Sequence, residues 1–522
     1  MPTHLPRSVV LAAVGLTAGV LALPASAGPY TTTSVYQASG TPSPPANGDS
    51  PFAACDISAF YRSPSDINYL NAEETPWVAV NPTDPGNIIG VYIQDWWSTN
   101  GGRGDVAAVS HDGGQTWTAT WPHFTICSGG TPANGGDYQR GWLPRVAFAP
   151  NGDAYFIAWT LSPVGDPAAT PSSILVSKST DGGDRWSEPI TLDLTHPNIP
   201  PYASVSRPFI TADPFDSNYV YAVWNRARLP GNTQGGGGNN AFSFRGDGFF
   251  SRSTDGGATW EPARAIYAPQ GNIFTTAHQI AVLADGTLVD IFDVEQGAAK
   301  NFNTCCDVQL IRSTDRGLTW SDPIEVGPDR GVPATNPDTG ASIRVALGIP
   351  DLAVDRNPAS PGYGSLYAVW PDVVGSGEHA KTRYPTVAFT QSTDGGLTWS
   401  PVTRVDQAPA GVQAFNPSVD VASDGTVAVT YYDFRSNTPD PGLLTDYWLI
   451  HCHANQDCTD ASSWAENHVA GPFDMDQAPQ TARGDFIGEW EGLTSSGTTF
   501  LPFFIQTTAT DMANTYLATV SP

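Results

Sequence analysis

The sequence contains little charge, and less than a third of that charge is positive. Charged residues make up 14% of the 522 positions, and 24 Lys and Arg stand against 51 Asp and Glu, for a net charge of −27. A chain this acidic has no diffuse attraction for phosphate backbones or anionic lipid surfaces. We therefore expect neither a nucleic acid nor a membrane among its partners.

Long apolar runs are also scarce. One run, from Val9 to Leu23, follows Arg7 and precedes Ala25-Ser26-Ala27, which has the small-x-small pattern of a signal-peptidase site. The run is shorter than the roughly 20 residues that span a bilayer. We expect residues 1–27 to be a signal peptide that is cleaved near Ala27, and the mature protein to be secreted.

Cysteine is sparse, and no C-x-x-C pair is present. The six cysteines are an even number in a chain expected to enter an oxidising compartment, which favours disulfides over zinc ligation. Cys452 and Cys458 are close enough to staple one hairpin, and Cys55 with Cys127 would tie the N-terminal segment to the first repeat. Cys305 and Cys306 could form a vicinal ring, or each could pair elsewhere.

Turn-forming and aromatic residues are abundant. The chain has 52 Gly and 46 Pro, together with 16 Trp, 18 Tyr and 22 Phe. Long helices are therefore not expected to dominate, whereas the aromatic side chains can fill a sizeable core. This composition predicts an all-β protein with many turns.

One short phrase recurs five times, with Asp positions 60 to 79 residues apart. Its first copy is Ser110-His-Asp112-Gly-Gly-Gln-Thr-Trp117. In this phrase Ser and Asp can bond the backbone of a tight turn, Gly provides positive φ, and Trp folds back onto the sheet. No copy of the phrase offers the spaced run of oxygen ligands that a calcium loop needs. The five predicted structural aspartates are Asp112, Asp181, Asp255, Asp315 and Asp394.

The phrase S-x-D-x-G-x-T-W resembles the Asp box, or BNR repeat, of the sialidase superfamily. A repeat of this length that carries several strands is typical of a β-propeller. In that superfamily the box lies on the turn between the third and fourth strands of a blade, away from the active site. The resemblance implies the architecture without implying a substrate.

Strand starts can be counted backwards from the boxes. Seven inner strands begin near residues 77, 145, 208, 279, 351, 418 and 491, and seven second strands end in an aromatic residue. We expect a single seven-bladed propeller over residues 73–522, with six blades as the alternative. Residues 28–72 form an N-terminal segment, and its strand from Tyr30 to Tyr36 is expected to complete the last blade, which otherwise has only three strands.

The site should lie where inner strands start and second strands end, because these points converge on the axis of a propeller. Carboxylates can transfer protons there, Arg can bind anionic groups, and aromatic rings can stack on sugars. The candidate substrate-binding residues are Arg145, Arg207, Arg226, Arg435, Trp96, Trp97, Asp372 and Gln279, and the strand starts add Glu73, Glu74, Arg140, His278, Asp351, Asn416 and Glu491.

The resemblance also implies roles for particular residues. Asp95 follows the second strand of the first blade, where sialidases carry their Asp acid/base. The entry to that blade reads Glu74-Thr-Pro-Trp77, however, without the Arg-Ile-Pro of sialidases, and the last inner strand lacks their Tyr nucleophile. Tyr432 could be a displaced nucleophile. Arg145, Arg207 and Arg435 could form an anion clamp.

We expect a secreted glycoside hydrolase that acts on the terminus of a glycan carrying an acidic sugar. Asp95 would donate the proton, and Asp433 or Glu489 would be the base or nucleophile. The alternatives are a polysaccharide lyase with His278, Tyr432 or a carboxylate as base, and a propeller that binds glycans or proteins without catalysis. We expect a monomer without a cofactor, and a structural calcium ion stays an open alternative.

Overall fold

The computed structural model describes residues 1, 29–39, 50–58, 60, 66–162, 171–196, 203–228, 245–271, 273–296, 306–345, 347–375 and 383–522. Over these residues the regular structure is almost entirely β. The exceptions are three short 3-10 helices, Ile126–Ser128, Ala461–Ser463 and Met475–Gln477. The all-β prediction is therefore confirmed. The predicted signal peptide lies outside the described residues, apart from residue 1.

The strands of the described residues form antiparallel groups of four, and the first three groups follow the chain order. Group 1 is β2 (Glu73–Val80), β3 (Ile88–Gln94), β4 (Gly104–Ser110) and β5 (Thr118–Thr120). Group 2 is β6 (Arg140–Phe148), β7 (Ala154–Leu161), β8 (Ser172–Ser179) and β9 (Ile190–Thr195). Group 3 is β10 (Ala203–Ala212), β11 (Val220–Arg228), β12 (Arg245–Ser253) and β13 (Arg264–Tyr267).

Three further groups continue this order. Group 4 is β14 (Ile273–Val282), β15 (Leu288–Gln296), β16 (Cys306–Ser313) and β17 (Ile324–Asp329), and one parallel bridge joins it to group 3. Group 5 is β19 (Asp351–Val354), β20 (Leu366–Asp372), β21 (Thr386–Ser392) and β22 (Thr403–Arg404). Group 6 is β23 (Ala414–Val421), β24 (Val427–Asp433), β25 (Leu444–Cys452) and β26 (Ala465–Asp474).

Group 7 combines both ends of the chain. It consists of β29 (Gly492–Ser496), β30 (Thr499–Gln506), β31 (Asn514–Ser521) and β1 (Thr31–Gln37). Strand β1 pairs antiparallel with β31 from Thr31↔Ser521 to Gln37↔Tyr516. A small additional sheet contains β18 (Ile343–Arg344), β27 (Gln480–Thr481) and β28 (Gly484–Phe486).

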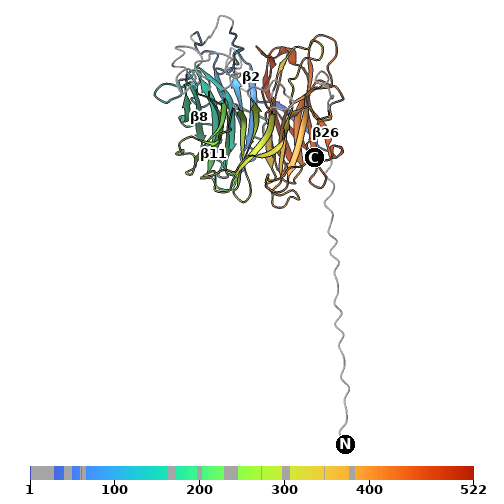
Figure 1. Cartoon of the computed structure of the whole chain (residues 1–522). Coiled ribbons are helices and arrows are strands. Elements are labelled where there is room, and N and C mark those ends of the chain that lie inside the picture. The colour runs from blue at the N-terminus through green and yellow to red at the C-terminus, as the bar shows by residue number, and fades with distance from the viewer. Residues whose placement is uncertain are drawn as a thin grey trace.

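The inner strands contact one another in cyclic order. Strands β2, β6, β10, β14, β19, β23 and β29 each contact the next, and β29 contacts β2. Gly90 of β3 shows how closely groups 1 and 7 pack, because the ring of Phe503 occupies the space that a Cβ at Gly90 would need. In Figure 1 the sheets stand side by side, and their connecting loops gather at the two ends of the strands.

The sheets pack through side chains that are buried on both faces. All seven residues of β3, including Val91 and Ile93, are buried, as are all seven of β24. Runs of this kind, rich in β-branched and aromatic residues, fit strands that are covered by neighbouring sheets on both sides. The core is therefore distributed over the interfaces between groups.

The five Asp boxes form tight turns with the hydrogen bonds that the sequence predicts. In the box of group 3, Ser253 Oγ donates to Asp255 Oδ1 at 2.8 Å, and the backbone N–H of Thr259 donates to the same oxygen at 2.8 Å. Thr259 Oγ1 donates to Asp255 Oδ2 at 2.6 Å. The serine-to-aspartate bond recurs in the other boxes at 2.7 to 2.8 Å.

Two predicted disulfides are confirmed. Cys55 bonds to Cys127, and Cys452 bonds to Cys458. Cys306 is also disulfide-bonded, and Cys305 lies outside the described residues. The bridge at Cys458 occupies the place of the box that group 6 lacks, and Trp464 Nε1 donates to the Cys458 carbonyl at 3.0 Å. In the first box Trp117 Nε1 likewise donates to the Gly114 carbonyl at 3.0 Å.

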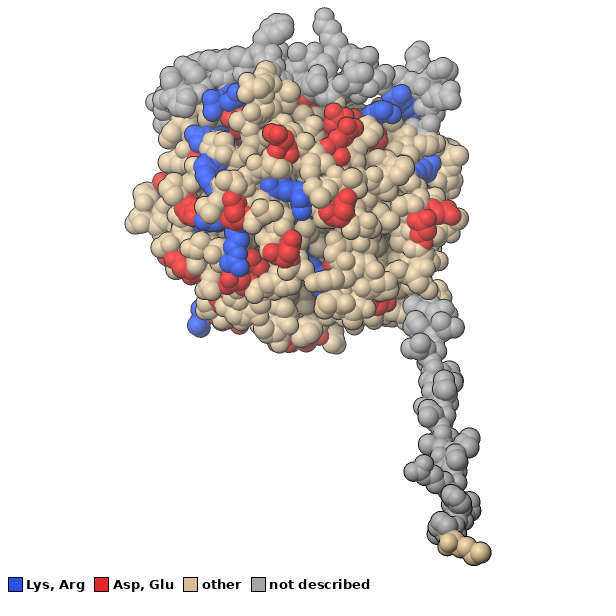
Figure 2. All heavy atoms as spheres, turned by 60° about the horizontal axis from the view of Figure 1, so that its bottom comes forward, with Lys and Arg blue, Asp and Glu red and all other residues tan. Residues whose placement is uncertain are grey.

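The surface carries both signs of charge. On the face shown in Figure 2, Lys and Arg lie interspersed with Asp and Glu among neutral residues. Within the described ranges no helix is long and apolar enough to cross a membrane.

Candidate active site

The inner strands are distorted where they enter the sheets. Five of them contain a β-bulge with a non-glycine residue at φ between 50° and 56°. A left-handed conformation costs such a residue roughly 1–2 kcal/mol, and bulges commonly redirect side chains next to active sites. The five residues are Thr75, Leu143, Arg207, Ala277 and Asn416.

A cavity lies at these strand entries and receives residues from the inner strands of groups 1 to 6 and from Glu489, Trp490 and Glu491, which directly precede β29. Its empty volume, counted together with the open solvent at its mouth, is about 480 Å³. Because residues at the entry of every inner strand contribute, the cavity lies where the inner strands converge. Its lining residues are Trp77, Arg145, Arg207, Pro208, Phe209, Ala277, His278, Gln279, Ile349, Pro350, Asp351, Pro417, Ser418, Glu489, Trp490 and Glu491.

Glu489 is held in the cavity by guanidinium groups. Arg207 Nη2 lies 3.2 Å from Oε2, and Arg344 Nη2 lies 3.0 Å from Oε1. Arg483 Nη2 lies 3.7 Å from Oε1. Burial alone would raise the pKa of Glu489, but the three arginines outweigh it and lower the pKa to about 2. Glu489 is therefore ionised at neutral pH.

Glu491 is in the opposite state. It is fully buried in the protein, and neither carboxyl oxygen has a hydrogen bond of good geometry. Burial raises its pKa well above the usual range of a glutamate. The neighbouring Glu74 is buried in the same way, and burial followed by the charge of Glu491 raises its pKa as well. Glu491 therefore holds a proton under conditions in which Glu489 is charged.

Arg145 lies between two indole rings of the cavity. Its guanidinium carbon is 4.4 Å from the ring centroid of Trp77 and 3.7 Å from that of Trp490. The buried Nε of Arg145 and the buried Nε1 of Trp490 have no hydrogen-bond partner. Burial lowers the pKa of Arg145, although Asp351 and Glu489 oppose the shift. Buried donors without partners call for an explanation, and a polar ligand would satisfy them.

Four of the residues predicted from the sequence meet in this cavity. Glu489, Arg145, Arg207 and Gln279 all line it, together with the strand-start residues His278, Asp351 and Glu491.

Asp95, the predicted proton donor, lies elsewhere and has many partners. Ser50 Oγ donates to Oδ2 at 2.5 Å, the Asn71 N–H donates to Oδ1 at 2.9 Å, and Arg103 Nε lies 3.6 Å from Oδ2. Asp95 is not among the residues that line the cavity. These contacts tie the N-terminal segment to group 1, which is a structural role that the sequence pattern did not reveal.

Tyr432, Asp433 and Arg435 also lie outside the cavity lining. The Tyr432 hydroxyl donates to the Ile505 carbonyl at 2.8 Å, and the residue is fully buried. Arg435 Nε donates to Asp433 Oδ2 at 2.6 Å, and its Nη1 donates to Glu466 at 2.6 Å. Arg435 therefore does not join Arg145 and Arg207 in a clamp.

The other four predicted binding residues are engaged in local contacts. Arg226 lies over Phe249 and 3.6 Å from Asp193. Trp96 and Trp97 are fully buried rather than open to a sugar. Asp372 accepts the N–H of Arg330 at 3.0 Å. Arg344 was not predicted from the sequence, because it belongs to the small β18 strand and not to a repeating unit. The stacking of Trp77 and Trp490 on Arg145 was not predicted either.

Over the part of the chain that the structure describes, no group of three or more His, Cys, Asp or Glu residues could hold a metal ion. A calcium ion elsewhere in the chain remains the open alternative stated from the sequence.

Comparison with known proteins supports the repeat. The family model described as BNR/Asp-box repeat matches residues 108–119, which contain the first box. The chain contains BNR/Asp-box repeats. This confirms the sequence-based resemblance to the Asp-box superfamily.

Curated relatives include glycoside hydrolases. A xyloglucanase of Hypocrea jecorina is 24% identical over 445 residues, which are 79% of this chain and 44% of that protein. A sialidase of Bacteroides fragilis is 26% identical over 198 residues, 34% of each chain. The chain spans less than half the length of the curated relatives it matches.

Solved structures with some likeness include two further glycosidases. A Hadza microbial sialidase has a TM-score of 0.44 and 14% identity, covering 83% of this chain and 73% of its own. An α-L-arabinanase of Penicillium chrysogenum has a TM-score of 0.41 and 15% identity, covering 73% of this chain and 94% of its own.

Proposed function

We propose that the chain is a glycoside hydrolase built on a seven-bladed propeller, with the axial cavity as its active site. Groups 1 to 7 would be the blades, and β1 would close the ring as the outer strand of the last blade. The cyclic contacts of the inner strands and the pairing of β1 with β31 support this arrangement.

The observation that carries the proposal is the contrast between Glu491 and Glu489 in one cavity. A carboxyl that holds a proton next to a carboxylate that stays charged is the division of roles that glycoside hydrolysis requires. Both residues line the cavity. Glycosidases among the curated relatives support the same reaction class.

In this mechanism Glu491 donates its proton to the glycosidic oxygen as the bond to the anomeric carbon breaks. Positive charge develops on the sugar, and the negative charge of Glu489 stabilises it electrostatically. Water then adds its hydroxyl to the anomeric carbon, and its proton returns to Glu491. Trp77 and Trp490 hold the guanidinium of Arg145 between them, and its unpartnered Nε can donate to a sugar oxygen.

Neither His278 nor Tyr432, the two side chains named individually as a lyase base, is free of hydrogen bonds. His278 Nδ1 lies 2.8 Å from Asp290 Oδ2, and its Nε2 lies 3.0 Å from Thr275 Oγ1. The Tyr432 hydroxyl is bonded to the backbone of Ile505 in both directions. Abstraction of a sugar proton by either group would require these bonds to break first.

The cellular setting belongs to the same proposal. We infer a secreted monomer, with residues 1–27 removed, residues 28–72 as an N-terminal segment and residues 73–522 as the propeller. The disulfides support an oxidising compartment. The partner would be a glycan or polysaccharide.

The test is product release from a panel of neutral, uronic and sialic glycosides, each at the terminus of an oligosaccharide. Hydrolysis of at least one class is expected, without the ultraviolet absorbance of an unsaturated sugar. Asp95→Asn should retain the activity of the folded wild type. Binding without any product would overturn the proposal, and unsaturated product would favour the lyase.

A further inference from the structure

Three arginines from different parts of the chain converge on the carboxylate of Glu489. Arg207 comes from β10, Arg344 from β18, and Arg483 from the turn between β27 and β28. The side chain of Glu489 is 4% exposed and that of Arg344 is 2% exposed, so the central pair is shielded from solvent. Such a pair interacts more strongly than an exposed one.

Other contacts hold Arg207 and Arg344 in place. Arg207 Nη1 donates to Thr276 Oγ1 at 2.7 Å, and Arg344 Nη1 donates to Asn100 Oδ1 at 2.6 Å. Each guanidinium therefore has one side fixed by a neutral oxygen and the other directed at Glu489. Arg207 and Arg344 each direct one Nη2 atom at a different oxygen of Glu489, and we call this pair the arginine fork. It matches a carboxylate, which the protein here supplies itself.

The lining of the cavity carries both signs of charge. Arg145 and Arg207 line it with positive charge, and Glu489 and Asp351 line it with negative charge. Asp351 Oδ2 accepts from Ser418 Oγ at 2.6 Å and from the Val419 N–H at 2.9 Å. Burial raises the pKa of Glu491 well above its usual range. The guanidinium of Arg207 is already paired with Glu489, and Arg344 and Arg483 contact the same carboxylate.

We propose that Glu489 determines specificity by filling the arginine fork, so that the cavity accepts neutral sugars and rejects sugars that carry a carboxylate. The inference rests on the proposed function, because it assumes that the cavity binds a sugar. A uronic or sialic carboxylate that approached Arg207 would meet the charge of Glu489, and like charges at close range oppose binding. The acidic substrate expected from the sequence is replaced here by a neutral glycan.

The test substitutes Glu489→Gln, which keeps the shape of the side chain and removes its charge. Two probes differ only in a carboxylate: methyl glucoside and methyl glucuronide. Binding is measured by titration with the tryptophan fluorescence of the cavity as readout. We expect the wild type to bind the glucoside at least as tightly as the glucuronide, and the variant to shift that ratio at least tenfold towards the glucuronide.

Inorganic sulfate tests the charge role separately from the sugar role. We expect sulfate to bind the Glu489→Gln variant and not the wild type, since the arginine fork is free only in the variant. Glu489→Gln combined with Arg207→Gln removes one charge of each sign and should lose the gained affinity for sulfate. Asp433→Asn is the matched control, because it removes a carboxylate that pairs with an arginine outside the cavity.

The outcomes separate the two proposals. Sulfate binding by the variant, with no binding of either glycoside, would retain the charge role and overturn the sugar site. Preference of the wild type for the glucuronide, or no gain of sulfate affinity in a variant with native circular dichroism, would overturn the specificity role. If Glu489→Gln does not fold, the double variant decides, since a folded double variant that binds sulfate contradicts the inference.

Discussion

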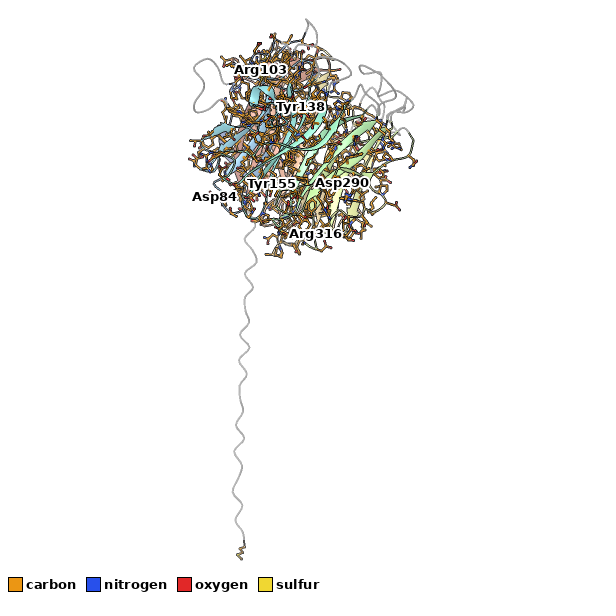
Figure 3. All side chains as sticks on the ribbon, turned by 90° about the vertical axis from the view of Figure 1, so that its left-hand side faces the viewer. Asp84, Arg103, Tyr138, Tyr155, Asp290 and Arg316 are labelled. Carbon is orange, nitrogen blue, oxygen red and sulfur yellow. A yellow bond between two sulfur atoms is a disulfide. The ribbon has the colours of Figure 1, made fainter. Side chains whose placement is uncertain are left out.

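The two ends of the sheets place a side-chain carboxyl group in opposite environments. At the box end, Asp255 is exposed and accepts hydrogen bonds from Ser253 and Thr259. At the cavity end, Glu491 is buried, and both oxygens lack a hydrogen bond of good geometry. Figure 3 separates the two ends: Arg316 of a box lies at the lower one, and Arg103, which pairs with Asp95, lies at the upper one.

The pKa values follow these environments. Hydrogen bonds from Thr259 Oγ1 and the Thr259 N–H lower the pKa of Asp255 to about 2, and equivalent bonds from Thr319 do the same for Asp315. Burial raises the pKa of Glu491. A carboxylate with satisfied bonds stabilises a turn, whereas one without them destabilises the fold and is kept at a functional site.

The largest effect should come from the cavity end. Glu491→Gln removes the proposed proton donor, and loss of a general acid costs about 10²- to 10⁴-fold in rate. We expect kcat to fall about 10³-fold in an assay on the best substrate of the panel, with little loss of thermal stability, because Gln resembles the protonated carboxyl. Wild-type activity should decline as pH rises through the raised pKa of Glu491.

The control for this variant is the change of its stability as pH rises above the ordinary pKa of a glutamate. A raised carboxyl pKa contributes stability below the ordinary value that is lost as pH rises through the folded value. Glu491→Gln removes this loss, so the variant should gain stability relative to wild type in denaturant titrations as pH increases. Full activity in Glu491→Gln would exclude it as proton donor.

The second largest effect concerns the turn of group 6, where a disulfide stands in for a box. Cys452→Ser with Cys458→Ser opens a short loop, and the loop-closure model gives about 2 kcal/mol for a bridge of this length. The midpoint of urea unfolding should shift accordingly, with kcat unchanged. A change in kcat without a shift of the midpoint would contradict a purely structural role.

Repeated features could be predicted from the sequence, whereas most unrepeated contacts could not; the disulfide between Cys55 and Cys127 is an exception. The boxes, the seven strand starts and the bridge between Cys452 and Cys458 recur or lie close in sequence, so local chemistry specifies them. The pairing of Asp95 with Ser50, or of Glu489 with Arg344, joins segments that are far apart and share no pattern. Position relative to a strand end placed Arg145 and Arg207 in the cavity, but it also nominated Arg226 and Arg435, because register alone does not fix side-chain direction.

The third effect concerns one box aspartate. Asp255→Ala removes the acceptor of three hydrogen bonds at an exposed turn, and loss of a comparable helix cap costs about 1 kcal/mol. Because the folded pKa of Asp255 is depressed to about 2, its contribution is present above the ordinary value and disappears as pH falls through about 2. Wild type and variant should therefore differ in unfolding free energy at pH 7 and converge near pH 2. A persistent difference at pH 2 would mean that shape, not charge, stabilises the turn.

The smallest effect is expected from Thr259→Val, which removes one hydroxyl bond from the same box. The backbone N–H of Thr259 still donates to Asp255 Oδ1, so only the 2.6 Å bond to Oδ2 is lost. A single hydrogen bond at an exposed site contributes about 0.5–1 kcal/mol. Thr116→Val in the first box is the matched variant, since Thr116 Oγ1 donates to Asp112 Oδ2 at 2.7 Å. Similar small losses in both boxes, measured by denaturant unfolding and without any effect on kcat, would show that the box end acts through repeated local bonds; unequal losses would mean that each box is stabilised by its own packing.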